Sequence, residues 1–209
     1  ANNIDLQKTG LDNNLYINYF LEGTFDNLDR SYFPTSGQYL LFRYAMLTDN
    51  FYRMNHEFPI NVLNLKLMKP FKIGQHIFLT PEISGRTIIN AEDSIPPIYR
   101  NFAGGKYDGN YLSQQISLPG SGGMEVMNHS VLKFQANLRY EMTQNQWLYA
   151  NLHILAQNDK PLRIFNGQYF KGINLGYSYM TVLGPFSIEA GYSELTKKIH
   201  AFLGIGYYF

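Results

Sequence analysis

Apolar and polar residues alternate with a period of two along much of this chain. In the segment 132–142 every even position is apolar or aromatic, and Lys133, Gln135, Asn137, Arg139 and Glu141 stand between them. Successive side chains of a β-strand point to opposite faces, so the segment predicts a strand with one apolar and one polar face. One face therefore meets an apolar medium, and the other meets water.

The same period marks eight further segments, so we predict nine strands and an all-β, antiparallel fold. The clearest are 15–22, 77–84, 148–156, 186–193 and 199–209, and the weaker ones are 38–47, 60–69 and 169–182. The predicted strands are roughly 9–14 residues long. A tilted transmembrane strand needs about 9–11 residues, whereas soluble strands average about 5–6. This length favours a transmembrane β-barrel over a water-soluble barrel with an aromatic core.

The side chains of the two faces fit such a barrel. Aromatic residues gather near the predicted strand ends, as in the interfacial girdles of outer-membrane barrels; they are Tyr16, Trp147, Tyr169, Tyr192, Tyr207, Tyr208 and Phe209. Ionisable residues on the opposite face are predicted to line the lumen; they are Lys133, Arg139, Glu141, His153, Glu189 and His200. They are either solvated in a wet barrel or form a gate or a loop-docking network.

The connections alternate between short and long. Residues 70–74, 143–145 and 183–185 are tight turns, whereas 48–59, 88–128 and 158–168 are long loops and 194–198 is a shorter one. Outer-membrane barrels have short periplasmic turns and longer outer loops, which places the tight turns, the longer turn 25–37 and the C-terminus on the periplasmic side. Residues 87–128 then form a long extracellular loop, either a plug or a lid, within one barrel domain covering 1–209.

An odd number of strands raises the question of closure. The first and last strands of a nine-stranded antiparallel sheet run the same way, so they cannot pair as an ordinary antiparallel barrel requires. Unpaired strand edges cannot face lipid, because their N–H and C=O groups would lack partners. We therefore expect either one strand more or fewer, or partner strands from a missing upstream segment or a second protomer. The first residues, from Ala1, lack Met and a signal sequence, as a mature or excised fragment would.

Composition narrows the function classes. Lys and Arg number 17 against 16 Asp and Glu, so a net charge of +1 gives no reason to expect a nucleic-acid partner. The chain has no cysteine, which removes disulfides, thiolate metal sites and cysteine nucleophiles. It has no Gly-x-Ser-x-Gly elbow, no phosphate-binding loop and no metal-like spacing of its histidines. We predict no enzyme activity, cofactor or metal here; any catalytic domain would lie outside this chain.

Three motifs, in matching order and spacing, resemble the BamA-type outer-membrane assembly superfamily. Residues 26–37 (DNLDRSYFPTSG) resemble its periplasmic turn, with Ser31 where the family often has Gly. Residues 99–105 (YRNFAGG) resemble the opening of its sixth outer loop, and 183–186 (LGPF) its turn before the last two strands. The chain also ends on Phe209, as outer-membrane barrels commonly do. The resemblance implies that the nine strands are the C-terminal part of a sixteen-stranded barrel in the bacterial outer membrane.

One departure concerns the long loop. The family's loop carries an Arg-Gly-aromatic signature whose Arg reaches into the barrel, but residues 106–111 read KYDGNY, with Asn110 nearest the place of that Arg. Residues 114–120 (QQISLPG) look more like a branch in which the barrel follows a patatin-like lipid hydrolase. This suggests modified transport or an anchoring role.

The resemblance singles out four groups of residues. The loop residues are Gly104, Gly105, Asp108, Gly109 and Asn110; the periplasmic-turn residues are Asp29, Arg30, Phe33, Pro34 and Gly37; the last-turn residues are Gly184 and Pro185; the C-terminal assembly signal is Tyr207 and Phe209. The glycine pair either lets the loop approach the barrel wall or is a loop-tip linker. The turn residues also have a plain reading as turn chemistry, and Phe209 as a girdle aromatic.

Three functions follow as hypotheses. The first is protein assembly or translocation at the outer membrane, with the barrel assembly machinery and outer-membrane lipid as partners. The second is an anchor for an upstream patatin-like hydrolase, and the third is a small stand-alone porin-like or structural barrel.

Overall fold

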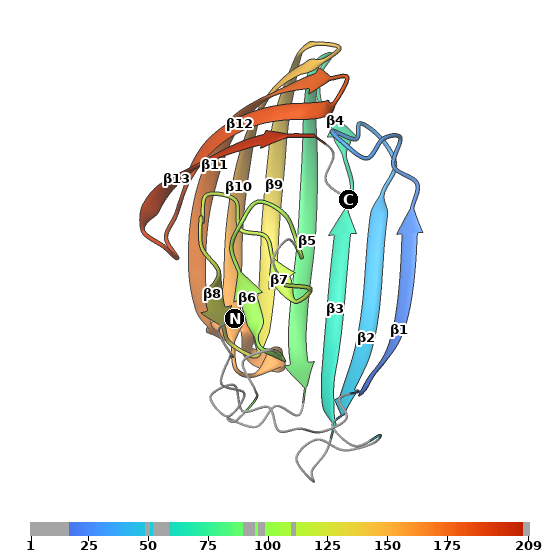
Figure 1. Ribbon diagram of the computed structural model, residues 1–209, viewed down its shortest axis with the longest axis vertical. Helices are drawn as coiled ribbons and strands as arrows, with labels where there is room; N and C mark the ends of the chain where they lie inside the picture. The colour runs from blue at the N-terminus through green and yellow to red at the C-terminus, as the bar shows by residue number, and fades with distance from the viewer. Residues whose placement is uncertain are drawn as a thin grey trace, which may run out of the picture.

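The computed structural model describes residues 17–48, 51, 59–89, 95, 99–109 and 112–206. In this part of the chain, nine long strands form one antiparallel sheet (Figure 1). They are β1 (Ile17–Asp26), β2 (Tyr39–Thr48), β3 (Ile60–Met68), β5 (Ile77–Ile89), β9 (Ser130–Thr143), β10 (Gln146–Asn158), β11 (Gln168–Thr181), β12 (Gly184–Ser193) and β13 (Lys198–Ile205). All nine predicted strands are present, so the predicted all-β fold is confirmed.

Each long strand pairs with the next long strand along the chain, in the order β1-β2-β3-β5-β9-β10-β11-β12-β13. The register runs almost without interruption, for example from Gln157 opposite Val131 to Trp147 opposite Glu141, and shifts once at the start of β10. Among the described residues β1 and β13 do not pair with each other, so the sheet is open. An open nine-stranded meander is the arrangement that the odd strand count predicts.

The two faces of the sheet differ as the alternation predicts. On β9, the Leu138 side chain is 45% exposed, whereas the neighbouring Arg139 is 3% exposed on the inner face. Large apolar side chains cover the outer face of the later strands; they include Phe134, Leu148, Leu152, Ile154, Leu175, Ile188 and Leu203. Because water would penalise so continuous an apolar surface, this face suits the lipid of a membrane.

The connections at one end of the sheet are short. The predicted tight turn 70–74 contains a two-residue strand, β4 (Phe71–Lys72), which pairs with β5. At the opposite end, a short 3-10 helix, η2 (Pro161–Asn166), lies between β10 and β11. No helix among the described residues is long and apolar enough to cross a membrane.

The long connection between β5 and β9 folds back onto the inner face of the sheet. It contains three short strands, β6 (Asn101–Ala103), β7 (Gln115–Ile116) and β8 (Glu125–Met127), in the order β7-β6-β8. Figure 1 shows this small sheet in front of β5, β9 and β10. Four residues of the long connection pack with two wall residues in one apolar cluster, made of Ala103, Ile116, Leu118, Met127, Val131 and Leu155.

The aromatic girdle is only partly as predicted. Tyr169 and Tyr192 lie on the outer face and are 43% and 40% exposed. Trp147 does not: it is 3% exposed and packs inside the sheet against Phe33. The prediction for Trp147 is wrong because its position has the parity of the inward-facing Tyr149, which proximity to a strand end does not reveal. Tyr16, Tyr207, Tyr208 and Phe209 lie outside the described residues.

Candidate functional site

The candidate site is the inner face of the sheet together with two segments that approach it from opposite ends. Lys133, Arg139, His153 and Glu189, predicted to face the lumen, are all buried on this face. Glu141 and His200 are half-buried at positions of the same parity. Burial of so many ionisable groups requires partners, and the two segments supply several of them.

The tip of the long loop is held by charges. Asp108 forms an ion pair with Lys66 of β3, and its other carboxylate oxygen accepts a hydrogen bond from the backbone N–H of Ser117 at 2.7 Å. Glu82 of β5 lies between two lysines, 3.6 Å from Lys66 Nζ and 2.9 Å from Lys133 Nζ. Lys133 also donates to the carbonyl of Ser117 at 3.1 Å. Lys66 of β3 and Lys133 of β9 thus bind the loop directly, and Glu82 of β5 lies between the two lysines.

These neighbours keep Asp108 ionised. Burial raises the pKa of its carboxyl group, but the charges of Lys133 and Lys66 and the hydrogen bonds from Lys66 and Ser117 outweigh burial. The pKa of Asp108 therefore lies well below its usual range. An ionised carboxylate at the loop tip makes this contact depend on the charges of Lys66 and Lys133.

A second ionic contact joins the loop to β12. Lys106 Nζ lies 3.3 Å from Glu189 Oε1 and donates to Ser187 Oγ at 2.7 Å. The other Glu189 oxygen accepts hydrogen bonds from Tyr149 at 2.8 Å and Asn174 at 3.0 Å. Lys106 and Asp108, two residues apart, thus reach strands on both sides of β9.

The base of the loop is held differently. Asn101 is fully buried and accepts a hydrogen bond from Arg86 of β5. Its amide donates to the carbonyls of Asn128 and His129, at 2.8 and 2.9 Å. Together with the apolar cluster, these contacts, none of which is an ion pair, make the base of the loop part of the wall, whereas its tip is held by ion pairs.

Glycines allow close approach of the backbone both within the long loop and between the loop and the wall. At Gly104 (φ +142°) a Cβ would collide with the backbone of Gly123, so the close approach is within the loop. At Gly120 (φ +87°) a Cβ would lie 2.9 Å from the backbone nitrogen of Tyr192, so the close approach to the wall occurs there. Gly109 also has a positive φ, of 68°, but faces open space.

The turn between β1 and β2 folds around Asp29. The Asp29 carboxylate accepts hydrogen bonds from the backbone N–H groups of Thr35 and Ser36, at 2.8 and 3.1 Å, and from the Thr35 hydroxyl at 2.7 Å. Burial raises the pKa of Asp29, but these bonds, with one from Arg30, lower it to about 2. Gly37, at φ +92°, passes so close to the backbone of Asn27 that a Cβ would collide with it.

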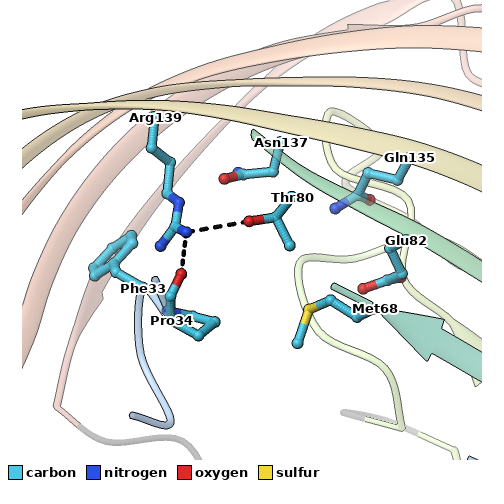
Figure 2. Close-up of a pocket in the computed structure, with 8 residues that line it drawn as sticks. All are labelled: Phe33, Pro34, Met68, Thr80, Glu82, Gln135, Asn137 and Arg139. Carbon is cyan, nitrogen blue, oxygen red and sulfur yellow. Dashed lines mark hydrogen bonds between the residues drawn. The ribbon is translucent and has the colours of Figure 1, made fainter. Parts of the chain in front are cut away.

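This turn reaches the wall through Phe33 and Pro34 (Figure 2). The Phe33 ring stacks on Trp147, with centroids 4.6 Å apart and an interplanar angle of 18°. Arg139 donates to the Pro34 carbonyl and to the Thr80 hydroxyl, and its guanidinium carbon lies 5.8 Å from the centroid of the Phe33 ring. Phe33 has φ +53°, a left-handed conformation that costs a residue with a Cβ roughly 1–2 kcal/mol.

The two segments meet across a cavity of about 260 Å³. Tyr32 and Phe33 line it from the turn, and Lys106, Tyr107 and Asp108 line it from the loop. A neighbouring cavity of about 190 Å³ lies between Phe33, Pro34 and the wall (Figure 2). Among the described residues no three His, Asp or Glu side chains are grouped to hold a metal ion.

The remaining predicted residues lie apart from this centre or outside the described residues. Gly184, at φ +108°, begins β12, and its carbonyl accepts a hydrogen bond from the Thr181 hydroxyl at 2.6 Å. The Pro185 carbonyl accepts one from the N–H of Gly206 at 3.2 Å. Asn110, Tyr207 and Phe209 are not described.

Sequence reasoning missed Lys66, Ser117 and Trp147 as site residues. Strand parity could have placed Lys66 and Trp147 on the inner face, because each shares its parity with other inward residues of its strand. No local signal marks Ser117, since its role depends on where the loop crosses β9.

Comparison with known protein families identifies a superfamily that the chain matches along its length. The family model described as the OMP85 superfamily matches residues 1–209. No curated protein matches the chain significantly.

Proposed function

Because the chain belongs to the OMP85 superfamily, whose members are outer-membrane proteins of assembly and translocation in general, we propose that it performs such a role as a membrane-embedded barrel domain. The inner face of the sheet and the loop docked on it are the parts that act on the translocated polypeptide. The loop regulates passage through the barrel by leaving or returning to the wall.

The observation that carries the proposal is the contrast between the tip and the base of the loop. Lys106 and Asp108 bind the wall through ion pairs with Glu189 and Lys66. When the tip leaves the wall, water in the lumen can solvate Lys106 and Asp108, whereas exposing the apolar cluster at the base to water is unfavourable. This supports a loop whose tip can be released while its base stays in place.

The open sheet supports a barrel completed by other strands. The edges of β1 and β13 would leave backbone N–H and C=O groups unpaired in lipid, which is too costly to persist. Further strands, upstream in the same polypeptide or from a second protomer, would pair with these edges. In the outer membrane, we expect the intact polypeptide to have a mass well above the 24.1 kDa of these 209 residues. A mass near that value would contradict the interpretation of these nine strands as part of a sixteen-stranded barrel. A nucleophile elbow in the upstream sequence would favour the role of an anchor for a patatin-like hydrolase.

The function is tested with the full-length protein in proteoliposomes supplied with an unfolded outer-membrane client. Asp108→Asn removes the negative charge of the loop that pairs with Lys66. Asp159→Asn is the matched control, because Asp159 is exposed in the connection after β10. We expect Asp108→Asn to change the rate of client insertion or translocation several-fold, and Asp159→Asn to leave it unchanged. Absence of any client insertion or translocation by the unmodified protein would contradict the proposal.

A further inference from the structure

The turn between β1 and β2, residues 27–38, is held together by its own hydrogen bonds and contacts the wall through few residues. We propose that this segment is a displaceable latch that narrows the lumen from the turn end, and that Arg139 and Trp147 form its receptor on the wall. The inference rests on the proposed function, since a latch has a purpose only in a barrel through which something passes.

The latch keeps its shape through its own hydrogen bonds. Asp29 binds Thr35 and Ser36, and the Asn27 side chain accepts a hydrogen bond from the N–H of Gln38 at 2.7 Å. The backbone N–H of Asn27 also donates to the Gln38 carbonyl at 3.2 Å. None of these bonds involves the wall, so the segment can leave the wall without unfolding.

Two consecutive residues of the latch contact the wall. Phe33 supplies the ring that stacks on Trp147. Pro34 supplies the carbonyl that Arg139 binds, as Figure 2 shows. Arg139 also lies 5.8 Å from the centroid of Phe78, so the receptor is itself built into the wall. A rigid segment docked through one ring and one carbonyl can undock as a unit.

The docked state is strained. Phe33 adopts φ +53°, which a bulky aromatic residue rarely does. Arg139 Nε is buried and has no hydrogen-bond partner among the described residues. Undocking exposes the Arg139 guanidinium to water, which gives Nε a hydrogen-bond partner and lowers the cost of release.

The latch and the loop close the same space from opposite ends. Tyr32 and Phe33 face Lys106, Tyr107 and Asp108 across the cavity of about 260 Å³. The loop tip is held by ion pairs and the latch by an aromatic stack, so the two closures respond to different conditions. Salt weakens the first more than the second.

The test measures access to the cavity behind the latch. Residues 1–209 contain no cysteine, so Asn137→Cys, at a position that lines both cavities, provides the one reporter thiol once any cysteine elsewhere in the full-length protein is replaced by serine. The full-length protein carrying this reporter is placed in lipid nanodiscs and treated with a polar maleimide. Phe33→Gly removes the ring, while glycine tolerates the positive φ and leaves the turn free to keep its shape.

We expect Phe33→Gly to raise the rate of maleimide labelling several-fold. Phe71→Ala is the matched control, because Phe71 is an exposed aromatic residue in β4, next to a turn at the same end of the sheet. It should leave the rate unchanged. Equal rates for Phe33→Gly and Phe71→Ala would overturn the proposal.

A second variant covers failure to fold. Phe33→Leu keeps an apolar side chain but cannot stack, and it should give an intermediate rate. If neither Phe33 variant assembles while Phe71→Ala does, the contact is a fixed structural element and the latch is refuted. Labelling needs no client polypeptide, so its result stands whether or not the client assay supports assembly or translocation.

Discussion

Neighbouring residues of β9 lie in opposite environments, one apolar and the next polar. Leu138 is 45% exposed on the outer face, and Asn137 lies on the inner face beside Asn151, to which it donates a hydrogen bond. At this scale the strand geometry decides the environment of each residue, because alternate side chains leave opposite faces. Whether a residue of the strand is apolar or polar therefore indicates whether its side chain faces lipid or the lumen.

Charged replacement at these two positions should have unequal effects. Leu138→Lys places a charge on the lipid face, where it costs about 2–4 kcal/mol near the membrane midplane. Asn137→Lys places the same charge in the wet lumen and should cost less. Measured as the folded fraction in lipid across a urea series, the Leu138 variant should be the less stable. Equal stabilities would contradict the assignment of the faces.

The Asp29 carboxyl should titrate far below an ordinary aspartate. Its pKa is lowered to about 2 from a usual value of 3.8, so its contribution to stability is complete above the unfolded value and is lost as pH falls towards 2. We expect the amide signals of Thr35 and Ser36, followed by NMR, to shift with a midpoint near pH 2. A midpoint near 3.8 would show that the turn does not hold the carboxylate. Asp29→Asn should abolish the titration.

At the scale of the element, the loop combines two kinds of attachment. Its base is apolar and neutral, through Leu118, Met127 and Asn101, and its tip is ionic, through Lys106 and Asp108. Gly120 lets the backbone just after Leu118 lie directly against β12. Such a division lets one part of an element move while the other part anchors it.

Two glycine variants separate wall contact from backbone conformation. Gly109→Ala and Gly120→Ala both place a Cβ at a positive φ, but only at Gly120 would the Cβ meet the wall, 2.9 Å from the Tyr192 nitrogen. Gly109→Ala should cost roughly 1–2 kcal/mol, from conformation alone. Gly120→Ala should cost more and make the loop susceptible to limited proteolysis. Equal susceptibility would argue against the docking of residue 120 on β12.

At the scale of the whole molecule, the sheet is curved around its contents but open at its edges. β1 is exposed on both faces over most of its length, whereas the inner face of β9 and β10 lies under the loop. The free edges are chemically incomplete in a membrane, because lipid offers no hydrogen-bond partner. The described sheet is therefore suited to be one part of a larger closed barrel.

Hydrogen exchange can detect the partner of β1. In the full-length protein in nanodiscs, the backbone amides of β1 that do not pair with β2 should be protected from exchange as strongly as those that do. The corresponding amides of β9, paired on both sides, are the internal standard. Rapid exchange along the free edge of β1 would contradict a closed barrel.

The sequence predicted the strands better than it predicted the site. The parity of Lys133, Arg139 and Glu189 placed them correctly on the inner face, since facing is a local property of a strand. Asp108 was singled out by a resemblance, but its partners Lys66 and Ser117 were not. Trp147 was assigned to the wrong face because its place near a strand end was weighed above its parity.

By itself, the sequence determined which segments become strands, which faces they present and which connections are long. These properties depend on residues one or two positions apart. The alternation of apolar and polar residues with a period of two therefore shows them in the sequence itself. Only the tertiary structure decided that the long loop and the turn 27–38 both fold inward and meet across one cavity. That result depends on contacts between residues as far apart as Pro34 and Arg139, or Lys106 and Glu189, for which the chain carries no local pattern.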